Sequence, residues 1–142
     1  MKRFLAIALA ITLLFALAGC GPKDYKEDIF HLVEKNYDAI VAACENKDTE
    51  ALLAINGITK VDIVDGYVLV FCKGAGNVPS SQYYGFYYSD ENLPVGVFDG
   101  EIICCSSELV EYENGYRYFD SSYNEFYTEQ IRGNIYFYSA KF

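Results

Sequence analysis

The chain has 142 residues and carries 20 acidic against 11 basic side chains, a formal net charge of −9. An excess of negative charge repels phosphate backbones and other polyanions, so nucleic acid is excluded as an expected partner. This length suits one domain with its own core rather than several domains.

The first residues have the order of an export signal. Lys2 and Arg3 form a positive n-region, residues 4–17 are apolar apart from Thr12, and Leu17-Ala18-Gly19-Cys20 follows. This order is typical of a secretory signal peptide, and the apolar run is shorter than the ~20 residues of a membrane-spanning helix. The Leu-Ala-Gly-Cys stretch resembles the lipobox of bacterial lipoproteins. The resemblance implies cleavage before Cys20 and a diacylglycerol on its sulfur; the alternative is an ordinary secreted protein with a chance cysteine there.

We therefore expect three segments: a signal peptide over residues 1–19, a lipidated tether over 20–24 and a single α+β domain over 25–142. Two acyl chains hold a protein stably on a membrane. The expected location is the extracytoplasmic face of the cell membrane, with the lipid on Cys20 as the membrane contact.

The first part of the domain has a helical pattern. Apolar residues recur at helical spacing over about 24–45, which predicts one amphipathic helix there. Asn46-Lys47-Asp48 ends it. Asp48 is a suitable N-cap for a second short helix that runs through Ile55 and ends at Asn56-Gly57.

From Ile58 onward the chain has the pattern of hairpins. Asp-Gly, Asn-Gly and Gly-Asn pairs stand between strand-like runs, and such pairs favour two-residue turns because both residues need positive φ. The pairs are Asp65-Gly66, Asp99-Gly100, Asn114-Gly115 and Gly133-Asn134. With the aromatic strand 82–89 they predict up to about nine short strands. The expected fold is α+β, with an N-terminal helix pair packed on one face of a twisted antiparallel meander of hairpins.

Each turn also predicts which residues face one another. Around Asp65-Gly66 the pairs run from Val64–Tyr67 to Thr59–Cys72. Their predicted core side is Thr59, Val61, Ile63, Val68, Val70 and Cys72. Around Asp99-Gly100, Val97–Ile102 and Val95–Cys104 share a face. Around Asn114-Gly115, one face holds Val110–Phe119 and Tyr112–Arg117, and the other holds Glu111–Tyr118 and Glu113–Tyr116.

Cysteine and histidine offer little evidence of chemistry. Cys44, Cys72, Cys104 and Cys105 remain besides the anchor, and an even number in an exported protein permits disulfides. Because Cys72 and Cys104 fall on predicted core faces, we expect buried free thiols, with a disulfide as the alternative. The chain has no CxxC pattern to suggest a metal site. His31 is the only histidine, and it is expected on a helix surface.

The carboxylates are numerous, and a glycoside hydrolase needs only two. Most of them lie in turns or beside them, where solvation already explains them: Asp65, Asp99, Glu101 and Glu113. Asp90-Glu91-Asn92 lacks the full calcium-loop pattern. No metal and no cofactor are therefore expected.

The aromatic residues are the strongest feature. From Tyr83 to Phe142 the chain holds eleven Tyr and six Phe. In the strand 82–89, Tyr83 and Tyr87 share one face, while Tyr84, Phe86 and Tyr88 share the other. Near the C-terminus, Ile131, Tyr136 and Tyr138 are expected opposite Ile135 and Phe137. We expect one set of rings in the core and the other on the outer face, where tyrosine offers an apolar ring with a polar tip.

Two longer stretches carry a family resemblance. "VDIVDGYVLVFCKGAGNVPSSQYYGFYYSDENLPV" and "YTEQIRGNIYFYSAKF" are similar to a group of uncharacterised small exported proteins and lipoproteins of Gram-positive bacteria. The resemblance implies a compartment and transfers no functional residue.

The sequence therefore favours a membrane-anchored, non-enzymatic binding or accessory lipoprotein that acts through a Tyr-rich sheet face. The candidate binding surface is Tyr84, Tyr88, Tyr116 and Tyr118, and the expected partner is an envelope protein or glycan. One alternative is a wall-active hydrolase using paired carboxylates. Another is an inhibitor or assembly partner of a second exported protein.

Overall fold

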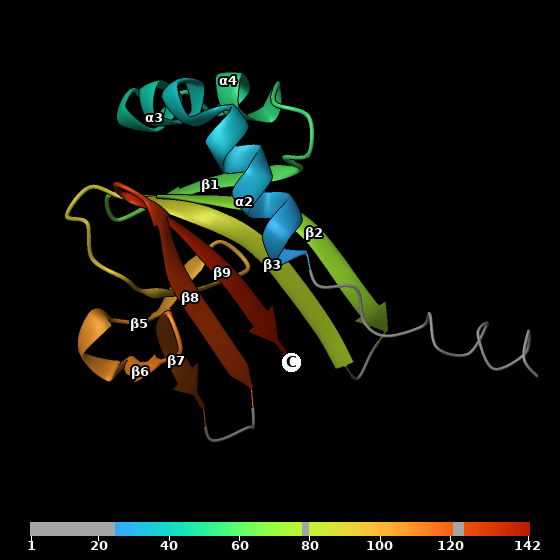
Figure 1. Cartoon of the computed structure of the whole chain (residues 1–142), viewed down its shortest axis with the longest axis vertical. Coiled ribbons are helices and arrows are strands. Elements are labelled where there is room, and N and C mark those ends of the chain that lie inside the picture. Colours follow the sequence, from blue (N-terminus) through green and yellow to red (C-terminus); the bar gives the residue numbers. More distant parts are fainter. Residues whose placement is uncertain (1–24, 78–79, 121–123) are drawn as a thin grey trace, which may run out of the picture.

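The computed structural model describes residues 25–77, 80–120 and 124–142. The predicted signal peptide, Cys20 and the tether lie outside these residues. Within them, three short α-helices come first and strands follow, with one 3-10 helical turn at Ser106–Glu108 (Figure 1), which is the α+β class expected from the sequence. None of the described helices is long and apolar enough to cross a membrane.

The helical part differs from the single helix predicted over 24–45. It consists of α2 (Lys26–Lys35) and α3 (Tyr37–Glu45), separated at Asn36. Asn36 leaves helical geometry with φ −115° and ψ 18°, and its Nδ2 donates to Leu32 O at 2.8 Å. An asparagine side chain that bonds the backbone in this way competes with helix continuation. The predicted N-cap of the next helix, α4 (Thr49–Leu53), is confirmed, because Asp48 Oδ1 accepts from Ala51 N at 3.0 Å.

A seven-stranded antiparallel sheet forms most of the domain. Its spatial order is β1-β2-β3-β9-β8-β7-β6. The bounds are β1 Lys60–Val64, β2 Tyr67–Asn77, β3 Ser80–Ser89, β6 Val110–Tyr112, β7 Gly115–Phe119, β8 Glu125–Arg132 and β9 Ile135–Lys141. The chain leaves this sheet after β3 and returns at the far edge with β6, so β3 pairs with the C-terminal strand β9.

The segment between β3 and β6 forms a small sheet of its own. Strands β4 (Gly96–Phe98) and β5 (Glu101–Cys104) pair across the predicted Asp99-Gly100 turn. Val97–Ile102 pair as expected, but Cys104 pairs with Gly96 rather than Val95, because the register shifts between Gly96 and Val97. A β-carbon on Gly96 would lie 2.4 Å from Cys104 Sγ, so only glycine leaves room for this pairing. We call β4, β5 and their turn the β4–β5 hairpin.

The first hairpin has the predicted register. The five pairs from Val64–Tyr67 to Lys60–Phe71 are present, but the predicted sixth pair, Thr59–Cys72, is not, because β1 begins at Lys60. Val68, Val70 and Cys72 are buried, as expected for the core side. Thr59 and Ile63 were predicted on this side too but are exposed, because β1 is the edge strand, where only Val61 packs against the core.

The hairpin predicted at Asn114-Gly115 is shifted. Val110 pairs with Arg117 and Tyr112 with Gly115, so the turn is Glu113-Asn114, with φ 53° at Glu113. Gly115 belongs to β7, where a β-carbon would lie 2.1 Å from Thr128 O of the neighbouring strand. The shift is by two residues, which changes the partners but leaves each side chain on its predicted face.

The main sheet has two different faces. On the first face, Val68, Val70, Tyr84, Phe86, Tyr88, Ile135 and Phe137 share one buried cluster with helical residues such as Ile29, Val33 and Ile40. On the second face, Leu69, Tyr87, Phe126, Tyr136 and Tyr138 form another cluster with Val95 and Val97 from the β4–β5 hairpin and the segment before it. Ile131, predicted beside Tyr136, packs instead against the first cluster, because the register of β8 shifts between Gln130 and Arg132.

A buried hydrogen-bond chain fixes the segment before β4 on the second face. Thr128 Oγ1 donates to Phe137 O at 2.9 Å, so the Tyr87 hydroxyl, 2.8 Å away, donates to Thr128 Oγ1. The same hydroxyl accepts from Val95 N at 3.0 Å. Tyr87 therefore has partners for both its donor and its acceptor, and it ties Val95 to the sheet.

Candidate functional site

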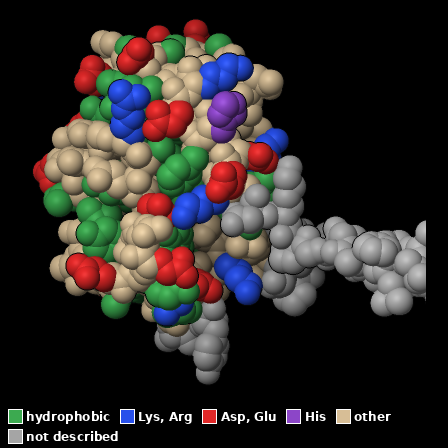
Figure 2. All heavy atoms as spheres, viewed as in Figure 1, with side chains coloured by type: hydrophobic (Ala, Val, Ile, Leu, Met, Phe, Trp, Pro, Cys, Tyr) green, Lys and Arg blue, Asp and Glu red, His purple; other side chains and the backbone are tan. Residues whose placement is uncertain are grey.

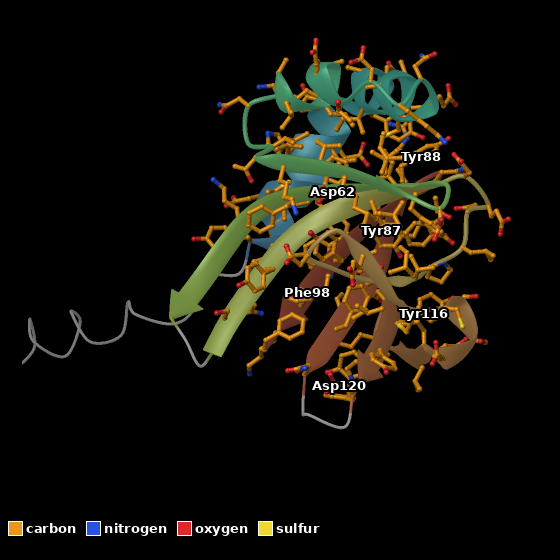
Figure 3. All side chains as sticks on the ribbon, turned by 180° about the vertical axis from the view of Figure 1, so that it is seen from behind. Asp62, Tyr87, Tyr88, Phe98, Tyr116 and Asp120 are labelled. Carbon is orange, nitrogen blue, oxygen red and sulfur yellow. The ribbon has the colours of Figure 1, made fainter. Side chains whose placement is uncertain are left out.

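The predicted exposed pair, Tyr84 and Tyr88, is buried. Their exposed fractions are 4% and 7%, and both belong to the first-face cluster. The Tyr84 ring meets the Tyr25 ring edge-on at 5.3 Å between centroids. Figure 3 shows Tyr88 on the side of the sheet toward the helices and Phe98 on the opposite side. The prediction that these two tyrosines form a binding plate is therefore wrong, although the alternation of faces along β3 is confirmed.

Tyr116 and Tyr118 lie on the second face, in β7, and both are half-buried. Tyr118 packs against the second-face cluster and lines a cavity of ≈ 370 Å³ with Phe98, Phe126 and Phe142. These two tyrosines remain part of a candidate surface, and the other rings of that surface were not identified from the sequence.

The thiols and the histidine lie as expected. Cys44, Cys72 and Cys104 are buried and Cys105 is exposed, and all four are free thiols. Burial raises the pKa of Cys44 and of Cys72 to about 12, which suppresses the reactive thiolate. His31 is exposed on α2; histidine is purple in Figure 2. Within the described ranges, no group of His, Cys, Asp and Glu side chains could hold a metal ion.

A cavity lies between the second face of the sheet and the β4–β5 hairpin. Its volume is ≈ 200 Å³. The sheet supplies Leu69, Phe71, Tyr83 and Tyr138, and the β4–β5 hairpin supplies Phe98, Asp99 and Gly100. Lys60 and Asp62 of the edge strand β1 complete the lining. In Figure 3, which views the molecule from the side opposite to Figure 1, the labelled side chains of Asp62 and Phe98 show where this region lies. We call it the hairpin cavity.

Strand register explains why these residues meet. Lys60, Phe71, Gly85 and Tyr138 are aligned across four neighbouring strands, and the next row is Asp62, Leu69, Tyr87 and Tyr136. Aligned residues on one face of a sheet are close neighbours. The edge strand thus places a lysine and an aspartate directly beside a row of aromatic rings.

Three charged groups lie at the mouth of the hairpin cavity. Lys60 Nζ lies 3.0 Å from Asp62 Oδ2 and 3.5 Å from Asp99 Oδ1. The hydrogen bond to Asp62 and the two carboxylate charges raise the pKa of Lys60. Gly100 lies against Asp62, since a β-carbon at position 100 would come within 2.7 Å of Oδ2. The turn of the β4–β5 hairpin therefore packs directly against the Asp62 carboxylate of the edge strand.

Aromatic rings form the walls. The Tyr83 ring lies 5.5 Å from Phe98 in a T-shaped arrangement and 6.0 Å from Phe71 at a tilt of 54°. Phe98 also packs on Phe142, with centroids 3.8 Å apart. Phe142 lines the ≈ 370 Å³ cavity, and Phe98 lines both that cavity and the hairpin cavity.

Sequence reasoning missed Lys60, Asp62 and Phe98 as site residues. The predicted register already paired Lys60 with Phe71 and Asp62 with Leu69, and a charged residue opposite a large apolar one was the available clue. Nothing in the local pattern placed Phe98 and Asp99 over the sheet, because that contact joins a separate hairpin to it.

Comparison with known proteins gives no relative to guide the assignment. No family model, curated protein or solved structure matches this chain. The function must therefore be argued from the cavity and the surface alone.

Proposed function

We propose that this chain is a membrane-anchored, non-enzymatic binding or accessory lipoprotein of the extracytoplasmic face. In this proposal the lipid on Cys20 holds the domain at the membrane and the helices cover the first face of the sheet. The Tyr-rich second face is the working surface, and its partner is an envelope protein or glycan that presents a small group to the hairpin cavity.

The observation that carries this proposal is the hairpin cavity itself. Binding sites for small groups are concave, largely apolar and aromatic, with a few polar groups that fix orientation. Here four large apolar side chains of the sheet and Phe98 surround the space, and Lys60, Asp62 and Asp99 supply the polar groups. A volume of ≈ 200 Å³ is too small for a polymer and suits one terminal group of a larger molecule.

The test uses the mature protein in detergent micelles with three kinds of probe: N-acetylglucosamine, D-alanyl-D-alanine and choline. We expect saturable binding of at least one probe by calorimetry. Replacing Tyr83 by Ala should weaken it about 30-fold, the typical effect of losing a central ring. Tyr112→Ala is the matched control, because Tyr112 lies on the first face and is 37% exposed. Absence of saturable binding, or equal loss in both variants, would contradict the proposal.

Wall hydrolysis is the second candidate, because two carboxylates do meet at one cavity. Asp62 and Asp99 contact the same lysine ammonium. A glycoside hydrolase needs two carboxyl groups that flank the scissile bond, one of them as the acid, whereas here both carboxylates contact one ammonium that occupies the space between them. Solubilisation of purified cell wall that disappears in both Asp62→Asn and Asp99→Asn would establish the hydrolase and overturn the binding assignment.

A further inference from the structure

We infer that the group bound in the hairpin cavity is an organic cation, an alkylammonium head group that takes the place of the Lys60 ammonium between Asp62 and Asp99. This inference rests on the proposed function and names the ligand class of the same cavity.

The charges around the cavity are arranged for a cation. Two carboxylates and one ammonium meet at its mouth, so the site has an excess of one negative charge with Lys60 in place and of two when Lys60 moves away. The chain as a whole carries a net charge of −9, which adds a long-range attraction for cations. An anionic ligand would be repelled, and a neutral ligand would gain hydrogen bonds from the carboxylates but no charge–charge attraction.

The aromatic walls favour the same ligand. The face of an aromatic ring is negative, and a cation within about 6 Å of a ring centroid is attracted to it. Phe71, Tyr83 and Phe98 line the cavity, and the plane of the Tyr83 ring is inclined by 54° to that of Phe71 and by 65° to that of Phe98, so rings of different orientation border the space. Rings around a positive group and carboxylates at its edge are the features that bind alkylated ammonium groups.

The Lys60 ammonium lies between the carboxylates of Asp62 and Asp99 but is not held rigidly there. Its side chain is 49% exposed and that of Asp99 is 78% exposed. Exposed ion pairs of this kind contribute little to stability, and a lysine side chain has a flexible stem. A soluble cation can therefore displace Lys60 at low cost, while the rings that line the cavity stay in place.

The volume limits the head group. An apolar cavity of about 150 Å³ in another protein holds a molecule of benzene, so ≈ 200 Å³ accommodates a head group of about that size. A trimethylammonium group with one or two further carbons, or a short primary alkylammonium, fits this limit.

The experiment compares choline and n-propylammonium with 3,3-dimethylbutan-1-ol, an uncharged molecule of choline's shape, by calorimetry on the mature protein in detergent. We expect at least one cation to bind at least tenfold more tightly than the neutral alcohol, and its affinity to fall as NaCl is raised. Lys60→Met should increase that affinity several-fold, because it leaves both carboxylates to the ligand. Asp99→Asn should reduce it about tenfold. Lys73→Met is the matched control, since it removes the same charge from an exposed position outside the cavity lining.

The outcomes separate the two claims. If the neutral alcohol binds as tightly as either cation and Tyr83→Ala removes that binding, the cavity is a binding site but the cation assignment is wrong. The assignment is also overturned if, in the variant Lys60→Met, neither cation binds more tightly than the neutral alcohol does. If the three probes of the functional test show no saturable binding either, the proposed function fails with it.

Discussion

Gly85 of β3 lies directly against the ring of Tyr138 on the neighbouring strand β9. A β-carbon at position 85 would come within 2.7 Å of Tyr138 Cε1 and within 2.0 Å of Val70 O. The glycine in the run of aromatic residues on β3 therefore makes room for a second-face ring. Because Tyr138 lines the hairpin cavity, Gly85 also determines the shape of the site.

Gly85→Ala is expected to destabilise the domain by about 1–3 kcal/mol, the usual cost of overpacking a core. The backbone oxygen of Val70 cannot move without disturbing the β2–β3 pairing, so relaxation is limited. Urea unfolding measures the change. Gly74→Ala in the same hairpin is the control, because the nearest atom to its β-carbon is 3.5 Å away, an ordinary contact. Equal stability of the two variants would mean that the close packing at Gly85 is incorrect.

Tyr84→Ala and Tyr88→Ala should each lower the free energy of unfolding by about 3–5 kcal/mol, the range for deleting a large core side chain. Both rings belong to the buried first-face cluster. Thermal melting of each variant, with Tyr112→Ala as the exposed control, provides the measurement. A variant with the melting temperature of the wild type would show that the tyrosine it lacks, Tyr84 or Tyr88, is not part of the core.

The sequence was most informative where turn chemistry and strand alternation act together. The Asp65-Gly66 turn set all five observed pairs of its hairpin, and alternation separated Tyr84 and Tyr88 from Tyr87. It could not tell which face the helices would cover, because both faces carry enough rings to form a core. The choice of the wrong face for the binding tyrosines follows directly from this.

Close approaches between strands explain the remaining differences. Asn114-Gly115 has the composition of a turn, yet Gly115 is needed inside β7 where Thr128 O approaches. Glu113 takes the positive φ instead. The hairpin cavity could not be predicted from the sequence either. Phe98 and Tyr83 are fifteen positions apart and meet only because the β4–β5 hairpin folds over the sheet.

Thiol labelling should distinguish one cysteine from the others in the domain. At neutral pH, Cys105 is expected to react with a thiol reagent in the native protein, because it is exposed. Cys44, Cys72 and Cys104 should react only after denaturation, since their thiols are buried. Peptide mass spectrometry assigns the label to each position. A cysteine that stays unlabelled in denaturant until a reductant is added would be in a disulfide, contrary to the structure.

The lipid anchor is tested by replacing Cys20, which lies outside the described residues. We expect the wild-type protein to enter the detergent-rich phase and to carry the mass of a diacylglycerol, because two acyl chains give stable membrane attachment. Cys20→Ala should lose both properties. Cys105→Ala is the control, since it removes an exposed thiol of the folded domain. Wild-type protein found wholly in the soluble secreted fraction would refute the anchor.

Alkaline pH is expected to unfold the domain through its buried thiols. Burial raises the pKa of Cys44 and of Cys72 from 9.0 to about 12. In the unfolded chain both thiols ionise near pH 9, so above that pH the unfolded state gives up protons that the folded state keeps. The free energy of unfolding therefore has its full value below about pH 9 and falls as the pH rises toward 12. Each thiol contributes a slope of about 1.4 kcal/mol per pH unit.

Urea unfolding at several pH values between about 8 and 11 measures this slope. Burial also raises the pKa of the Tyr87 and Tyr138 phenols above 10.0, so these groups add to the loss at the upper end of the range. The double variant Cys44→Ala with Cys72→Ala should be less stable at pH 8 because of the cavities it creates. Its stability should nevertheless decline less steeply between pH 9 and 10.5, before the tyrosines dominate. An identical slope in the two proteins would show that the two thiols do not govern the alkaline transition.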